Sequence, residues 1–319
     1  MGVGMYATTD LSMGDHILTE RPLTISPIGI KIPGGIEERG ERLSPEQLRQ
    51  AMLFEWEKLL EMCFKRLEPE NQTAFMALAN SHTKDGSGPI TAIVRTNGFE
   101  VDKLQDSVPE GSYVAVCKIM SRINHSCSPS ADRLFDVPSF SFQLRATRDI
   151  KAGEEIFVSY CDVLEEAAHR QAYLAPYEIV CICASCTPDT TESDERRLGL
   201  RESIGLIESD FDDWIADPLL ADDKTINTSL KWLEVIKQEA LEASDAYRHH
   251  VYAIVRAYVA LGDVENAIKY GRLLGLWYRG QSGKDDTLRL MLDPEYHKAR
   301  PAWRLRVCAY HDETEHDSS

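Results

Sequence analysis

The spacing of apolar residues separates predicted helices from predicted strands along the chain. After Ser44-Pro45, apolar side chains recur every three or four positions, at Leu48, Met52, Leu53, Trp56, Leu59, Leu60, Cys63 and Phe64. This spacing predicts a helix with one buried face, and Pro45 suits its first turn. A second helix is predicted over Asn71–Ala79. Residues Ser139–Thr147 alternate instead, with Phe140, Phe142, Leu144 and Ala146 on one side, which predicts a strand.

The N-terminal part of the chain combines glycine turns with short predicted elements. A strand is predicted over His16–Glu20, after the turn Met13-Gly14-Asp15. The stretch Pro27–Gly40 is rich in proline and glycine, which predicts a loop. The segment Ile90–Phe99 predicts a helix that ends at Asn97, where asparagine followed by glycine is also a common helix terminus.

The C-terminal part of the chain is predicted to be helical. A short helix is expected over Glu165–Tyr177, and the polar stretch Asp189–Glu195 is the predicted domain boundary. Apolar residues return to helical spacing from Leu230 onward. The segment Tyr258–Ala267 resembles one tetratricopeptide-type helical hairpin, although no repeat of 34 residues accompanies it. The strand-rich first part lacks the alternating strand–helix units of a doubly wound sheet.

Composition narrows the class of protein. The chain of 319 residues has 43% hydrophobic and 27% charged residues, as expected of a globular protein with two domains. Its net charge of -17 argues against direct nucleic-acid binding and suits a basic peptide partner. No apolar run is long enough to span a membrane. Acidic residues interrupt the N-terminus, so no secretory signal is expected and the eight cysteines are interpreted as thiols or metal ligands.

Three short motifs carry the candidate chemistry. They are Arg122-Ile123-Asn124-His125-Ser126-Cys127-Ser128-Pro129, then Gly153-Glu154-Glu155-Ile156-Phe157-Val158-Ser159-Tyr160, then Cys181-Ile182-Cys183-Ala184-Ser185-Cys186. The last motif supplies three thiolates in a compact arrangement, and a structural zinc site needs a fourth ligand. By residue type alone the fourth ligand is Cys127, Cys161, Cys117 or His169.

In this order, the three motifs resemble those of the SET-domain protein lysine methyltransferases, in the branch that includes the SMYD enzymes. Cys63 is the only cysteine between Met1 and Val116, so the MYND finger of that branch is not expected. The resemblance implies an α+β fold. A SET domain would span residues 1–188, with a helical insert at about 41–80 and a post-SET zinc segment at about 177–188. An all-α, tetratricopeptide-like domain would follow over 195–310, with a disordered tail over 311–319.

The resemblance also implies the roles of individual residues. Tyr160 matches the family's active-site tyrosine, whose hydroxyl orients the methyl group or the amine. Cofactor contacts with S-adenosylmethionine fall on Gly2, Gly4, Met5, Asn97, Asn124, His125, Tyr160 and Ile179. A structural Zn²⁺ would be bound by Cys127, Cys181, Cys183 and Cys186. Two positions depart from the family pattern: Ser130 replaces an asparagine, and Ile179 replaces an aromatic residue that covers the adenine.

The expected function is transfer of a methyl group from S-adenosylmethionine to a lysine of a protein or peptide, with histones among the candidates. The lysine must react as the neutral amine, although its reference pKa is near 10.4. An apolar channel and the sulfonium charge both favour that neutral form. The chain is expected to act as a monomer in the nucleus, the cytoplasm or both, without a membrane partner. The alternative is a catalytically silent SET scaffold that binds peptides. A small-molecule zinc enzyme is disfavoured because four cysteines leave no open metal position.

Overall fold

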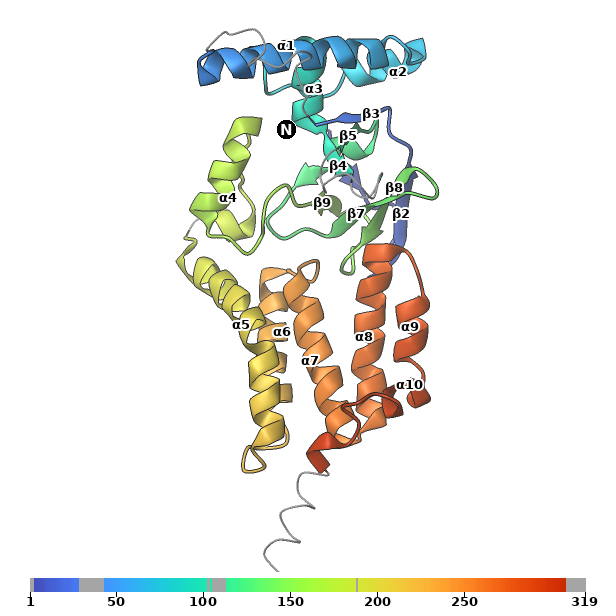
Figure 1. Cartoon of the computed structure of the whole chain (residues 1–319), viewed down its shortest axis with the longest axis vertical. Helices are drawn as coiled ribbons and strands as arrows, with labels where there is room; N and C mark the ends of the chain where they lie inside the picture. The colour runs from blue at the N-terminus through green and yellow to red at the C-terminus, as the bar shows by residue number, and fades with distance from the viewer. Residues whose placement is uncertain (1–2, 29–42, 102–103, 105–112, 188, 308–319) are drawn as a thin grey trace, which may run out of the picture.

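In the computed structural model, three parts follow one another along the long axis of the molecule: a layer of helices, a group of short strands and a bundle of longer helices (Figure 1). The structure describes residues 3–28, 43–101, 104, 113–187 and 189–307. Gly2, most of the loop predicted over Pro27–Gly40 and the tail predicted over 311–319 lie outside the described residues. The combination of separate sheets and helices confirms the predicted α+β class.

The described strands form three sheets of three strands each. The first sheet contains β1 (Met5–Tyr6), β9 (Glu155–Val158) and β6 (Asn124–His125). The second sheet contains β2 (His16–Glu20), β8 (Ser141–Ala146) and β7 (Ala131–Asp136). The third sheet contains β3 (Thr24–Pro27), β5 (Tyr113–Val116) and β4 (Phe99–Val101). All pairs are antiparallel except β6 with β9. This parallel pair sets Asn124 opposite Phe157 and His125 opposite Val158. The chain approaching Tyr160 therefore runs beside the Asn124 motif.

The predicted strands are present, with one error in their alternation. The strand predicted over His16–Glu20 is β2, and the one predicted over Ser139–Thr147 contains β8. Phe142, Leu144 and Ala146 are buried as predicted. Phe140 is not, because it belongs to the turn between β7 and β8, where its φ is 51° and 48% of its surface is exposed. Its N–H donates to the Val137 carbonyl across that turn.

The helical layer is built on the apolar face that the sequence predicted. Helix α1 (Pro45–Phe64) begins with a capping box, in which Ser44 and Gln47 each bond the other's backbone N–H. Helix α2 (Pro69–Met76) starts and ends earlier than the predicted Asn71–Ala79, since Pro69 is accommodated in its first turn. Helix α3 (Pro89–Asn97) ends at Asn97 as predicted. The three helices pack with β5 in one buried cluster of apolar side chains, among them Leu60, Phe75 and Val116.

Helices account for the regular structure described after residue 166. The helix predicted over Glu165–Tyr177 is α4 (Ala167–Leu174) followed by the 3-10 turn η2 (Ala175–Tyr177), and η3 (Ala184–Cys186) closes the cysteine motif. The bundle contains α5 (Thr191–Ala216), α6 (Lys224–Glu239), α7 (Asp245–Leu261), α8 (Val264–Ser282), α9 (Asp286–Met291) and α10 (Pro294–Lys298). Gly262, at φ 74°, turns the chain between α7 and α8, so a helical hairpin forms there. Its tetratricopeptide-like character stays a prediction.

The helical bundle packs directly against the strands. Helix α8 contacts both β7 and β8, and Figure 1 shows its upper end beneath these strands. Gly14, at φ 89°, lies at this contact, where a Cβ would come within 3.3 Å of the Leu276 carbonyl oxygen. A side chain at position 14 would therefore strain the backbone and push α8 away.

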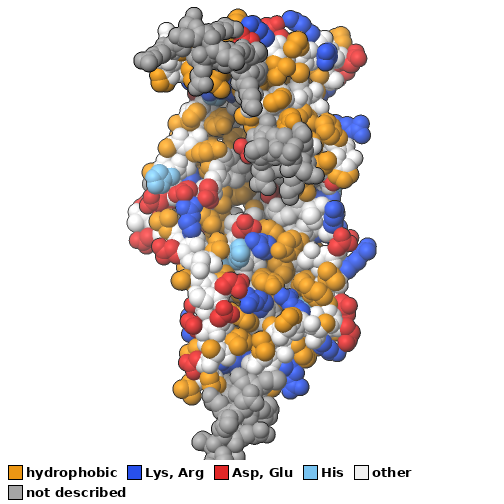
Figure 2. Space-filling model, in the orientation of Figure 1, with side chains coloured by type: hydrophobic (Ala, Val, Ile, Leu, Met, Phe, Trp, Pro, Cys, Tyr) orange, Lys and Arg blue, Asp and Glu red, His pale blue; other side chains and the backbone are white. Residues whose placement is uncertain are grey.

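No helix in the described part of the chain is both long and apolar enough to cross a membrane. Acidic and basic side chains are interspersed on the face seen in Figure 2, with hydrophobic side chains between them. On this face the net charge of -17 is therefore not gathered into one patch of a single sign.

Candidate functional site

Tyr160 and the Asn124 motif meet where β6 and β9 end. The Tyr160 hydroxyl donates a hydrogen bond to the backbone carbonyl of Ile123. The backbone N–H of Tyr160 donates to His125 Nδ1 at 3.0 Å, and the two rings lie with their centres 5.3 Å apart. These contacts bring together residues separated by 35 to 37 positions in the sequence. They hold the phenol ring of Tyr160 in one orientation.

The tautomer of His125 follows from its two contacts. Nδ1 accepts from Tyr160, so the ring proton of the neutral form belongs on Nε2, which lies 3.4 Å from Cys127 Sγ. His125 thus connects Tyr160 to Cys127. The sequence placed His125 and Cys127 in one motif, but the contact with Tyr160 depends on the parallel pairing of β6 with β9.

Asn124 lies against Gly4, near the N-terminus. Its Nδ2 donates to Glu155 Oε1 at 2.7 Å, and a Cβ at position 4 would lie 2.2 Å from that same oxygen. A side chain at position 4 would therefore displace the Glu155 carboxylate from its hydrogen bond with Asn124. Among the described residues the Asn124 side-chain oxygen accepts no hydrogen bond, so it remains available for a polar ligand. Met5 follows directly and pairs with Ile156 in the same sheet.

Ser130, which replaces the asparagine of the family pattern, has a complete set of partners. The residue is fully buried. Its hydroxyl accepts from the Phe157 N–H at 3.0 Å, and its own N–H donates to the Phe157 carbonyl at 3.0 Å. Serine at this position therefore secures the Asn124 motif to β9, and the departure leaves no polar group without a partner.

Asn97 and Ile179 are held by backbone contacts. Both amide hydrogens of Asn97 are used, on the carbonyls of Ala79 and Ile93 at 2.7 and 2.8 Å. A ligand could then reach only its side-chain oxygen or its backbone. Ile179 accepts from Gln171 through its carbonyl, and Gln171 also accepts from the Cys181 N–H. Gln171 thus fixes the segment that leads into the cysteine motif, a role the sequence did not indicate.

Four cysteine sulfurs gather beside His125. The Sγ atoms of Cys127, Cys181, Cys183 and Cys186 all lie within 4.8 Å of one another, so this group could hold a metal ion. Cys127 Sγ is 3.6 Å from Cys186 Sγ and 3.8 Å from Cys181 Sγ. Tetrahedral zinc with bonds of about 2.3 Å requires sulfurs about 3.8 Å apart, so the spacing fits.

The other candidates for the fourth ligand lie in different surroundings. Cys117 is fully buried in the strand core, away from the cysteine motif. His169 is largely exposed and faces Glu165 and Glu166. Cys161 approaches Cys127 from the side of His125. Only Cys127, of the four candidates, has its sulfur grouped with all three sulfurs of the Cys181–Cys186 motif.

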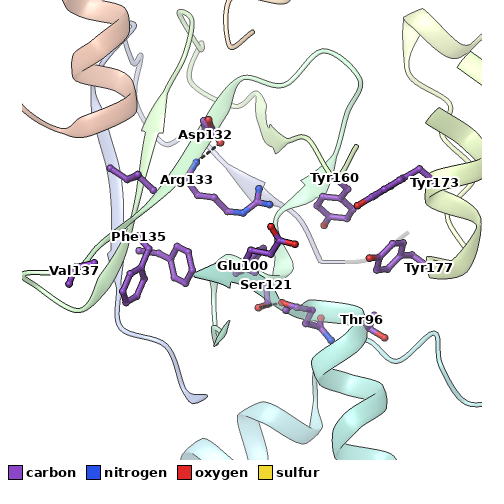
Figure 3. A pocket seen from close by; sticks show the side chains of 15 residues that line it. Thr96, Glu100, Ser121, Asp132, Arg133, Phe135, Val137, Tyr160, Tyr173 and Tyr177 are labelled. Atoms are coloured by element: carbon purple, nitrogen blue, oxygen red, sulfur yellow. Dashed lines mark hydrogen bonds between the residues drawn. The ribbon is translucent and has the colours of Figure 1, made fainter. Parts of the chain in front are cut away.

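A pocket of about 460 Å³ opens beside Tyr160 (Figure 3). Its wall combines the end of α3, strands β4 and β7, and the segment of α4 and η2. The polar and charged residues of this wall include Thr96, Glu100, Ser121, Asp132, Arg133, Tyr160, Tyr173 and Tyr177. Asn97 also lines this pocket, and Ile179 does not. Sequence reasoning missed Arg133 and both outer tyrosines, although Tyr177 stands only four positions before Cys181.

Burial controls the ionisation of the pocket tyrosines. Desolvation raises the pKa of Tyr160, and the nearby Arg133 charge only partly offsets this effect. Desolvation also raises the pKa of Tyr177, with Tyr173 and Glu100 adding to the rise and Arg95 opposing it. Both phenols therefore stay protonated at neutral pH, where they can donate hydrogen bonds but cannot act as bases.

A buried polar network joins this site to the helical bundle. Arg197, on α5, donates to the carbonyl of Cys127 at 3.0 Å and to Ser185 Oγ at 2.8 Å. It also pairs with Glu239 of α6 at 3.0 Å. Ser128 donates to the Glu239 carbonyl at 2.7 Å. The cysteine motif, the Asn124 motif and two helices of the bundle thus meet in one network, which no sequence pattern had indicated.

Comparison with known proteins gives a consistent assignment. The family model for the SET domain matches residues 2–161. The chain is 27% identical over 201 residues to the histone-lysine N-methyltransferase set5 of Schizosaccharomyces pombe, covering 61% of this chain and 52% of that protein. It is 27% identical over 192 residues to the N-lysine methyltransferase SMYD2-B of Danio rerio, covering 56% and 43%. It is 29% identical over 160 residues to human histone-lysine N-methyltransferase SMYD3, covering 48% and 35%.

The matched segments span about half or less of each of these relatives. The family model, however, covers half of the present chain, and its last residues include Tyr160. Its range contains Gly4 and Met5, the Asn124 motif and the strand pairing that brings them together. The chain therefore belongs to the SET domain family.

Proposed function

We propose that this chain is a protein-lysine N-methyltransferase that uses S-adenosylmethionine. The observation that supports this best is the position of Tyr160, whose hydroxyl is held at the Ile123 carbonyl on the wall of a pocket large enough for a side chain. The names of three relatives, all lysine methyltransferases, agree with this reaction class. The identity of the donor is inferred from the family.

The proposed chemistry needs alignment more than acid–base catalysis. When bound, S-adenosylmethionine supplies an electrophilic methyl group on its sulfonium. Tyr160 orients the reacting groups through its protonated hydroxyl, while Phe99 and Tyr177 exclude water from the lysine side chain. Because desolvation disfavours the ammonium form, the pocket itself promotes loss of the lysine proton to solvent.

The proposed cofactor contacts are those expected from the sequence. Gly4, Met5, Asn124 and His125 lie together where β1, β6 and β9 meet. Among the described residues the side-chain oxygens of Asn124 and Asn97 accept no hydrogen bond, so both can receive one from the ligand. Ile179 would provide an apolar wall. Gly2 lies outside the described residues and remains an expectation.

We also propose that Cys127, Cys181, Cys183 and Cys186 bind one structural zinc ion. The sulfur spacing supports this ligand set, and Arg170 adds a positive charge 3.7 Å from Cys186 Sγ that favours thiolates. Four protein ligands close the coordination shell, so the metal would secure the segment around Ile179 and take no part in the reaction. Elemental analysis of the folded chain should give one zinc per molecule; no stoichiometric zinc would refute the assignment.

The proposed substrate is a lysine-bearing protein or peptide. Two of the relatives are named as histone-lysine enzymes, so histones are the first substrates to test. The net charge of -17 favours approach of a basic chain by long-range attraction. We propose further that the chain acts as a monomer in the nucleus or cytoplasm and does not bind nucleic acid directly.

The decisive test is replacement of Tyr160 by phenylalanine. This change removes one oxygen and leaves the ring against His125, so packing should survive. Methyl transfer from labelled S-adenosylmethionine to core histones should fall about 100-fold, because alignment is lost. Cofactor affinity measured by calorimetry should not change. Tyr258→Phe, in the helical bundle, is the matched control and should transfer at the wild-type rate.

Two results would contradict the proposal. Transfer by Tyr160→Phe at the wild-type rate would remove the tyrosine from the reaction. Absence of transfer by the wild-type chain to histones and to a cell lysate, with cofactor bound, would favour the silent scaffold instead.

A further inference from the structure

Arg133 places a guanidinium group inside the pocket that holds Tyr160. It belongs to β7, at the edge of its sheet, and its Cζ lies 4.6 Å from the centre of the Phe99 ring. Its Nη1 donates to the Ser159 carbonyl at 3.4 Å, next to Tyr160 in the chain. Figure 3 shows this side chain extending from β7 into the pocket, toward Tyr160. The cation is therefore part of the wall that an incoming lysine would meet.

No described residue forms an ion pair with the Arg133 guanidinium, although Asp132, its neighbour in the chain, interacts with its charge. The guanidinium contacts a neutral carbonyl and an aromatic ring. The adjacent Asp132 accepts from the backbone N–H of Arg133 and not from the guanidinium. Desolvation raises the pKa of Asp132, and the charge of Arg133 and the hydrogen bonds from the Arg133 backbone and Gln281 oppose this rise. Structural arginines are usually paired when they are taken from solvent.

We propose that Arg133 is a specificity-determining residue of the pocket, which admits the target lysine as a neutral amine and disfavours the ammonium form. This inference rests on the proposed function and adds a property of this chain to it. Two cations in one pocket repel each other, and the repulsion is lost only when the lysine gives up its proton. Arginine can exert this effect because it keeps its own charge at any pH used for the reaction.

Other charged groups facing the pocket have weaker or balanced effects. Glu100, on β4, lines the pocket and has the opposite sign, but it is exposed, so solvent and salt screen it. Arg95, on α3, is paired with Asp85. Asp132, on β7, also lines the pocket, and its carboxylate accepts from the backbone N–H of Arg133. The phenols of Tyr160 and Tyr177 stay protonated, since burial raises the pKa of each. Arg133 is thus the unpaired cation among the described residues of this wall.

The proposal predicts a particular pattern of pH dependence. A lower pKa of the bound lysine shifts the midpoint of the kcat profile toward lower pH, since kcat reports groups in the enzyme–substrate complex. The profile of kcat/KM reports the free enzyme and the free lysine. Replacing Arg133 should therefore not move the midpoint that the free lysine gives to this profile. Loss of packing alone would lower kcat at every pH without moving either midpoint.

The experiment compares the wild-type chain, Arg133→Met and Arg133→Lys, with S-adenosylmethionine and core histones as the probe. Methionine retains apolar length without charge, and lysine retains charge without the planar group. We expect the kcat midpoint of Arg133→Met to rise by about one pH unit. Arg133→Lys should keep the wild-type midpoint even if its kcat is lower. Equal midpoints for all three forms, or equal shifts in both variants, would overturn the proposal.

A second measurement does not depend on turnover. The phenol of Tyr160 is titrated by ultraviolet difference spectra between each form and the same form carrying Tyr160→Phe. Removing the Arg133 charge should raise the pKa of Tyr160, and the Arg133→Lys form should match the wild type. An unchanged Tyr160 pKa in Arg133→Met would overturn the proposal. If the wild-type chain methylates no histone, the proposed function fails for that substrate, while this titration still decides whether Arg133 acts on the pocket.

Discussion

Arg197, where the strands meet the helical bundle, and Arg133, in the pocket, have different surroundings. At the junction, all three guanidinium nitrogens of Arg197 have partners, which include Ser193, Ser185, Glu239 and the carbonyl of Cys127. In the pocket, Arg133 lies on Phe99 and contacts one carbonyl. Arg197 is fully buried and Arg133 is half-buried.

The difference separates a group that supports the fold from one that is available to a ligand. A buried charge is tolerated when the protein supplies every partner that water would have provided. Arg197 meets this condition through groups from the cysteine motif, α5 and α6, so moving any of these segments would leave a charge unsatisfied. Among the described residues Arg133 has no ion-pair partner beside Tyr160, and a folded chain gains little from that position. A charge retained without structural benefit is a reason to look for function.

The largest effect is expected at the junction. Arg197→Met should lower the free energy of unfolding by about 3–5 kcal/mol, because the buried Glu239 would keep only Arg196 as a cationic partner and the Cys127 carbonyl and Ser185 would lose their donor. Urea denaturation measures this loss. Arg201→Met is the control: Arg201 lies one helical turn further on α5 and pairs with Asp162 and Glu165 at the surface. Its loss should cost about 1 kcal/mol or less. Equal losses in the two variants would remove the distinction between buried and exposed pairs.

A smaller effect, visible only in acid, is expected from His250 in the helical bundle. This histidine is buried between Ser203 and Ser229, and desolvation lowers its pKa to about 4. A histidine whose pKa is lower in the folded state stabilises the fold fully above its unfolded pKa, about 6.5. That contribution, about 3 kcal/mol, should be lost as the pH falls from about 6.5 toward 4.

The check is the free energy of unfolding of wild type and His250→Gln between pH 7 and pH 4. The variant should lose less stability over this window than the wild type, since no buried imidazole must accept a proton. His169→Gln, at a largely exposed histidine, should follow the wild-type curve. If His250→Gln also follows the wild-type curve, burial does not oppose protonation of His250 as its lowered pKa implies.

The smallest effect is expected for the pocket arginine. Arg133→Met should change the free energy of unfolding by about 1 kcal/mol or less, the value of one cation–aromatic contact. Urea denaturation of this variant, run beside Arg197→Met, therefore sharpens the comparison. A loss as large as that of Arg197→Met would make Arg133 a structural residue and remove the reason to assign it a role in the pocket.

Local patterns in the sequence determined helix α1, strands β2 and β8, and the motifs. Helix α1 was predicted from its apolar spacing and its Ser44-Pro45 start, and strand β8 from its alternation. Both predictions succeed because each depends on neighbours a few positions away. Phe140 failed because a turn ended the alternation sooner than the pattern suggested. The assignment to the SET domain family likewise followed from short motifs in a particular order.

Tertiary structure decided how these motifs meet. Strands β1 and β6 contain two residues each, too few for any periodic signal, yet they bring Gly4 and Asn124 to Glu155. Arg197 and Glu239 stand 42 positions apart, and Arg133 and Phe99 lie on different sheets. Sequence reasoning therefore named Tyr160 and the cysteine group but missed the arginine that contacts Phe99 and the Ser159 carbonyl. Whether an arginine is paired or left open depends on partners distant in the chain, and only the packed structure supplies or withholds them.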